Sequence, residues 1–240
     1  MTKMIAFFLV ALIGIALRRL ILGEYESYQL QLTYIFLVAS VVFLWISISQ
    51  KRKDGAYTPI HSKEQWTTSL SDKWFTGEKR IYQREELVAT YNRFYTRKYH
   101  KIVADLMNTP GLWFLQLTFH FKNGRTFTVT SNENWKGNAR YTIWEKDKNV
   151  AEIRSDLKSE HVKKLLEQTL IEIGGNVYEF RARTIQSRIE LVKNGEPIGE
   201  VDRDLIGGIR SLSFHSSEVS DESEPILLIC WIVFTYRFNK

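Results

Sequence analysis

Residues that commonly carry catalysis are few and scattered in this 240-residue chain. Cys230, the only cysteine, lies inside an apolar run, where burial raises the pKa of a thiol and makes it inert. No nucleophile elbow, phosphate loop or dinucleotide fingerprint is present. The five histidines lack metal-ligand spacing and are expected at structural or surface positions: His61, His100, His120, His161 and His215. The sequence therefore predicts a non-enzymatic protein with no cofactor and no metal site.

Two basic clusters could instead contact a lipid surface. The first is interleaved with tyrosine and phenylalanine side chains, a combination typical of membrane interfaces. The second follows an apolar segment directly. The candidate lipid-binding residues are Arg93, Arg97, Lys98 and Lys101 in the first cluster and Lys51, Arg52 and Lys53 in the second. The alternatives are an ordinary solvated strand face for the first cluster and a simple stop-transfer signal for the second.

Two apolar segments near the N-terminus have the length and composition of membrane helices. Residues 4–22 are apolar except for Arg18 and Arg19, whose long side chains can reach the headgroups. Residues 32–49 carry no charge over eighteen positions, enough to cross most of a ~30 Å hydrocarbon core. Alternatives for the first segment are a signal peptide or an interfacial helix. We predict a membrane hairpin over residues 1–53.

The distribution of positive charge predicts how this hairpin is oriented. Lys3 precedes the first span, and the second basic cluster follows the second span. The intervening loop holds two arginines beside Glu24 and Glu26. Cytoplasmic segments carry the excess of Lys and Arg, so both ends of the hairpin are expected in the cytoplasm. The prediction is a multi-pass protein of the cell membrane with a cytoplasmic soluble domain.

The remainder of the chain reads as a β-rich domain after a lead-in at residues 54–79. Four hairpins are expected, and Asn123-Gly124 and Asn194-Gly195 mark two of their turns because these residues tolerate positive φ. Further strands are expected at Arg80–Gln83, Leu87–Tyr95, His100–Met107 and Ile209–Ser216, and one amphipathic helix around Asp156–Thr169. About twelve strands with so little helix favour a mainly β fold closed into a barrel, or a sandwich.

The C-terminal segment is apolar on every side. Pro225 and the apolar run Ile226–Phe234 predict a helix at about 224–238, with Asp221 and Glu224 forming a capping box. This helix is too short for an unaided membrane span and needs burial all round. A closed barrel with the helix through its centre satisfies both conditions, whereas a buried central strand is the alternative.

This arrangement over residues 80–240 resembles the family of tubby C-terminal-like domains, phospholipid scramblases and LURP-one-related proteins, in a bacterial-type, membrane-anchored form. The resemblance rests on the hairpins from Tyr178 to Val201 and on the run from Glu224 to Val233. It implies a twelve-stranded closed barrel around a hydrophobic C-terminal helix. Neither the phosphoinositide-binding residues of tubby proteins nor the calcium segment of scramblases can be placed on this sequence.

The resemblance implies a membrane-proximal role and no specific chemistry. The formal net charge of +6 has both signs interspersed, and no nucleic-acid motif is present. The expected function is a membrane-tethered, non-enzymatic module that contacts anionic lipid headgroups or a membrane partner. The alternative is a structural or interaction protein whose barrel binds another protein without recognising lipid.

Overall fold

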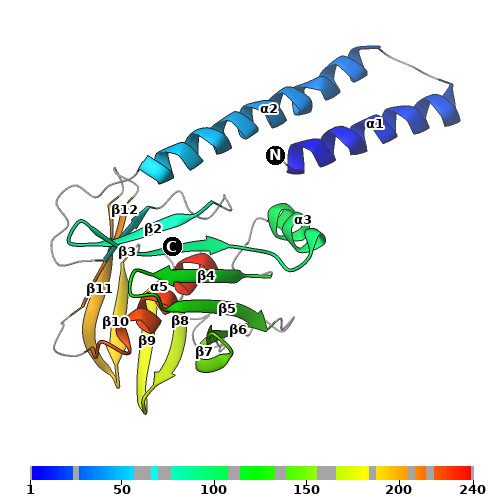
Figure 1. Ribbon diagram of the computed structural model, residues 1–240. Helices are drawn as coiled ribbons and strands as arrows, with labels where there is room; N and C mark the ends of the chain where they lie inside the picture. The colour runs from blue at the N-terminus through cyan, green and yellow to red at the C-terminus, as the bar shows by residue number, and fades with distance from the viewer. Residues whose placement is uncertain are drawn as a thin grey trace.

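The chain forms an N-terminal helical hairpin and a β-rich domain with one helix at its centre (Figure 1). The computed structural model describes residues 2–23, 27–56, 66–69, 77–107, 114–132, 139–155, 166–183, 188–204, 209–214 and 219–238. In the hairpin, α1 (Thr2–Leu22) and α2 (Ser27–Ala56) run antiparallel and contact each other. The next helix, α3 (Lys98–Met107), contacts α1 beside the β-rich domain.

The β-rich domain is an antiparallel sheet in which strands adjacent in sequence are adjacent in space. Its strands are β1 (Trp66–Ser69), β2 (Lys79–Gln83), β3 (Glu86–Arg93), β4 (Gln116–Phe121), β5 (Thr126–Asn132), β6 (Ala139–Glu145), β7 (Lys148–Ser155), β8 (Leu166–Ile173), β9 (Asn176–Arg183), β10 (Ile189–Lys193), β11 (Glu196–Asp204) and β12 (Ile209–Phe214). All four predicted hairpins are confirmed. Gly124 and Gly195 have φ values of 82° and 99°, as their tight turns require.

The prediction that residues 80–240 close into a barrel by themselves is wrong, because the ladder of strands closes only through β1, which lies before residue 80. The eleven strands β2–β12 form one antiparallel sheet whose edge strands, β2 and β12, do not pair with each other. Between these edges lies β1, with Trp66 opposite both Leu212 of β12 and Gln83 of β2. The twelve strands therefore form a closed barrel only because of these four residues, Trp66–Ser69, which the sequence analysis assigns to the lead-in. This short polar strand has no apolar alternation by which the sequence could reveal it.

Two further assignments are wrong. The strand predicted at His100–Met107 is the helix α3, in which the buried His100 and the half-buried Val103 lie three residues apart on one face. The helix predicted around Asp156–Thr169 conflicts with β8, which begins at Leu166 and pairs with β9 along its whole length. The earlier part of that predicted helix lies outside the described residues.

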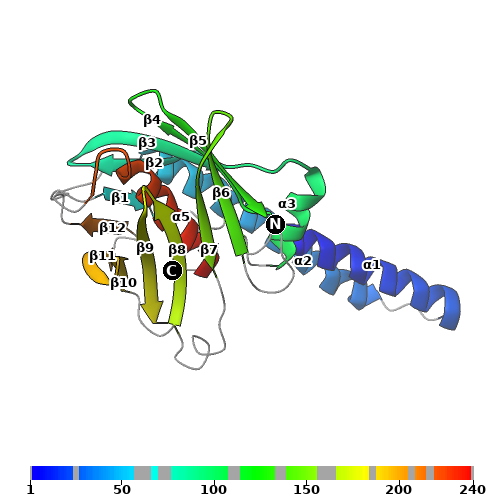
Figure 2. The ribbon, with the colours of Figure 1, turned by 90° about the horizontal axis from the view of Figure 1, so that it is seen from below.

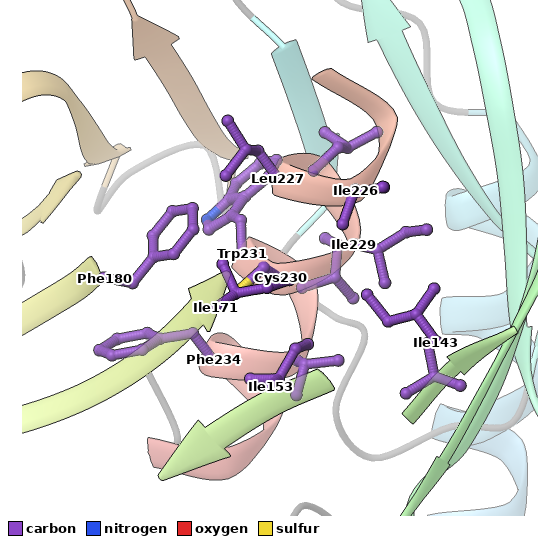
Figure 3. Packing of buried hydrophobic residues seen from close by; sticks show 14 of the residues in the cluster. Ile143, Ile153, Ile171, Phe180, Ile226, Leu227, Ile229, Cys230, Trp231 and Phe234 are labelled. Atoms are coloured by element: carbon purple, nitrogen blue, oxygen red, sulfur yellow. The ribbon is translucent and has the colours of Figure 1, made fainter. Parts of the chain in front are cut away.

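The hydrophobic core surrounds the C-terminal helix, α5 (Glu224–Phe238), which lies where the sequence predicts a helix. Every residue from Pro225 to Arg237 is buried. Figure 3 shows side chains of several strands converging on it, with Phe180 near Phe234 and the isoleucines of β6, β7 and β8 along its length. Alternate strand residues point inward, as the period of two requires. A helix that is apolar all round is thus buried all round.

The two ends of the sheet differ because successive antiparallel connections alternate between them. The tight turns β2–β3, β4–β5, β6–β7, β8–β9 and β10–β11 lie at one end, which we call the turn end. The connection containing α3 lies at the other, the α3 end. Figure 2 shows the β4–β5 turn and α3 on opposite sides of the domain, with α1 and α2 beside α3.

Candidate membrane-contact surface

The hairpin carries most of the exposed apolar surface of the described residues. Of their 27 exposed large hydrophobic side chains, 23 lie on α1 and α2. Two windows, Ile5–Leu22 and Ser27–Ile46, are long and apolar enough to cross a membrane by length and composition. None of the first window and 11% of the second is buried inside the structure. The β-rich domain therefore does not cover this surface.

Two hydroxyl groups of α2 are satisfied within their own helix. The hydroxyl groups of Thr33 and Ser40 donate to the backbone carbonyl oxygens of Leu30 and Leu37, both at 2.7 Å. Such bonds to the preceding turn allow a hydroxyl to sit in an apolar environment without an unpaired donor. The helices pack through aromatic pairs, with ring centroids of Phe7 and Phe36 6.1 Å apart.

The second basic cluster, Lys51–Lys53, lies near the C-terminal end of α2, beyond the apolar window. Arg52 is exposed there. The cluster follows the last apolar turns, which is where positive charges meet headgroups at the end of a span.

The structure divides the first basic cluster. Arg93 is only 5% exposed, on the inward face of β3, and its guanidinium lies 5.1 Å from the ring centroid of Tyr95. By contrast, Arg97, Lys98 and Lys101 are all exposed on α3 or immediately before it. Three of the four predicted cations therefore share one surface, and the fourth lies in the interior.

One face of α3 is fixed to the domain. His100 is buried, and its ring stacks on Phe114 with centroids 3.9 Å apart and planes 3° apart. Its Nδ1 lies 3.2 Å from the hydroxyl of Thr96, and the ring of Tyr99 meets it edge-on. Spacing of three residues places Val103, which is half-buried, on the same inner face. His100 thus has the structural role that we predicted for it.

The opposite face of α3 is both apolar and basic. Tyr99 and Ile102 are 49% and 48% exposed, and Lys98 and Lys101 flank them. The guanidinium of Arg97 donates to the hydroxyl of Tyr99 at 3.1 Å. We define Arg97, Lys98, Tyr99, Lys101 and Ile102 as the α3 patch. Ile102 is not among the site residues predicted from the sequence, although its spacing of three from Tyr99 is a signal that could reveal it.

Polar groups inside the sheet support α5 and do not form a catalytic arrangement among the described residues. Trp66 of β1 donates from Nε1 to Oε1 of Glu224 at 3.1 Å, and burial raises the pKa of that half-buried carboxyl. Burial likewise raises the pKa of Cys230 to about 12 and that of Tyr141, beside Arg237, to about 12. Burial thus disfavours the charged forms of these groups, which is the opposite of what an activated nucleophile requires.

The described residues contain no group of three or more metal-ligating side chains. A hollow of about 510 Å³ lies along β7, β8 and β9, where β7 and β8 pair only at Ile153–Ile171 and Arg154–Leu170. It is an open depression, and one of its carboxylates, Glu152, is engaged by Arg140 and Arg154. It therefore lacks the enclosed form of a small-molecule site.

Comparison with known proteins agrees with this architecture. A family model described as Tubby C-terminal like domain matches residues 69–238. No curated protein and no solved structure matches the chain significantly. The matched segment runs from the last residue of β1 through the whole of α5. The resemblance drawn from the hairpins and the apolar terminal run is confirmed, and the chain belongs to the Tubby C-terminal like domain family.

Proposed function

We propose that the chain is a membrane-tethered, non-enzymatic module in which α1 and α2 cross a bilayer and hold the tubby-like domain at its surface. The observation that carries this proposal is the uncovered apolar hairpin, with 23 exposed large hydrophobic side chains. At about 25 cal/mol per Å² of apolar surface, such a hairpin is strongly stabilised by a hydrocarbon environment.

Orientation follows from charge in this proposal. Lys51, Arg52 and Lys53 lie beyond the apolar window of α2 and stay on the cytoplasmic side, together with the domain that follows them. The hairpin thereby concentrates the domain at the inner membrane surface, where anionic headgroups lie within reach.

The test uses the full chain expressed in cells, with membranes washed at alkaline pH. We expect the protein to stay in the pellet, as integral proteins do. Replacing Val38 and Val42 by Asp places two charges on exposed positions of α2, at about 2.5–3.5 kcal/mol each near a span centre. This variant should be released, whereas the matched control with Leu at both positions should not. Release of the unaltered chain would contradict the proposal.

A further inference from the structure

We propose that the α3 patch is a second membrane contact, at which α3 lies flat on an anionic bilayer surface beside the hairpin. This inference rests on the proposed function, because the hairpin supplies the bilayer. The occupant is the headgroup layer of the same membrane in which α1 and α2 are anchored.

The first support is the location of the remaining exposed apolar side chains. Outside the hairpin, the described residues expose only four large hydrophobic side chains: Leu87, Tyr99, Ile102 and Val177. Two of the four lie on α3, one helical turn apart. The helix contacts α1, and Figures 1 and 2 both place it beside the hairpin. The apolar surface of the hairpin thus continues onto α3.

The second support is chemical complementarity. The α3 patch combines a tyrosine and an isoleucine with Arg97, Lys98 and Lys101, all exposed. An aromatic ring and an aliphatic side chain suit the boundary between headgroups and acyl chains, and cations suit anionic headgroups. Three cations favour the docked helix roughly a hundredfold at an anionic surface over a neutral one.

The third support is rigidity. Stacking of His100 on Phe114 fixes the inner face of α3 to the domain, and the outer face is thereby held outward. Docking then requires little additional ordering of the helix, which keeps its entropic cost small.

The opposite end of the sheet carries exposed lysines too, at Lys122, Lys146 and Lys148. Lys122 and Lys146 lie on turns at the turn end, Lys148 begins β7 beside them, and the three serve as a matched control.

The experiment places the full chain in nanodiscs of phosphatidylcholine alone or mixed with phosphatidylglycerol. An environment-sensitive fluorophore is attached through Ile102→Cys, Val177→Cys or Val38→Cys, in separate proteins. Cys230 is fully buried and should not react in the folded chain. Lipids carrying a nitroxide near the headgroup quench fluorophores at the membrane surface.

We expect strong quenching at position 102 in mixed discs, weaker quenching in neutral discs, and none at position 177. The variant R97Q/K98Q/K101Q should lose the quenching at position 102, whereas K122Q/K146Q/K148Q should keep it. High salt should weaken it, because salt screens exposed charges.

Three results would overturn the inference. In the first, position 102 is as unquenched as position 177, although acyl-chain nitroxides quench position 38 in the same discs. The hairpin is then inserted and the proposed function stands, but the α3 contact is refuted. Equal quenching in neutral and mixed discs, or in the R97Q/K98Q/K101Q variant and the unaltered chain, would refute an anionic surface. Absence of quenching at position 38 as well would refute the tether and the α3 contact together.

Discussion

Trp231 is the side chain whose removal should damage the core most, because it is the largest of the fully buried side chains on α5. A buried tryptophan removes about 150–250 Å² from water, worth roughly 4–6 kcal/mol at 25 cal/mol per Å². Its Nε1 has no hydrogen-bond partner among the described residues, so part of that gain is already offset. Both considerations agree with the range of about 3–5 kcal/mol measured for such truncations.

Cys230 provides the assay, since it is the only cysteine, is 0% exposed and neighbours Trp231. A thiol reagent reaches Cys230 only when the core opens. If the reagent reacts slowly compared with reclosing of the core, the labelling rate reports the opening equilibrium. Destabilisation of 3–5 kcal/mol at 1.4 kcal/mol per tenfold predicts labelling roughly a hundredfold to a few thousandfold faster in Trp231→Ala. The control, Ile102→Ala, removes an exposed side chain and should change the rate little.

The reasoning fails if Trp231→Ala labels no faster than the unaltered chain. It fails equally if Cys230 in the unaltered, folded chain reacts as fast as a free thiol. Either result would mean that α5 is not the packed centre of the domain.

Three further predictions concern charge and topology. Glu224→Gln should stabilise the chain slightly at neutral pH, because burial raises the carboxyl pKa and disfavours its ionised form. In the unaltered chain the contribution of Glu224 to stability therefore rises as the pH falls from 7 toward 4.5. The melting temperatures of the two proteins should converge at the lower pH. Arg125, bonded to Glu145 at 2.7 Å, lowers that carboxyl's pKa, so this pair's stabilisation should fade below pH 4.5 and be absent in Glu145→Gln. An impermeant thiol reagent should label Val177→Cys only after cell lysis if the domain is cytoplasmic, and efficient labelling of intact cells would reverse the orientation.

The hairpins of the sheet were predictable because local chemistry determines them. Asn194 and Gly195 both adopt positive φ, which few residue pairs tolerate, and the flanking strands alternate with period two. The apolar run of α5 was predictable for a similar reason, since its composition leaves no face for water.

Long-range pairing decided the elements that the sequence could not reveal. β1 has four residues, and its place between β2 and β12 depends on partners some 15 and 145 positions away. α3 contains Ile102 and Val103, whose β-branched side chains favour a strand, yet the stacking of His100 on Phe114 accompanies a helix. Burial of Arg93 likewise depends on which face of β3 points inward, a register set by neighbouring strands.

The most direct test of the membrane tether is spin-label accessibility on the full chain in nanodiscs. Labels at Ile13→Cys in α1 and Val38→Cys in α2 occupy exposed positions, 59% and 61% accessible in the structure. We predict that both labels collide readily with oxygen, which partitions into lipid, and rarely with a water-soluble nickel complex, while a label at Val177→Cys shows the reverse. Frequent collisions with nickel at either hairpin position would contradict the account, because that helix would then lie in water.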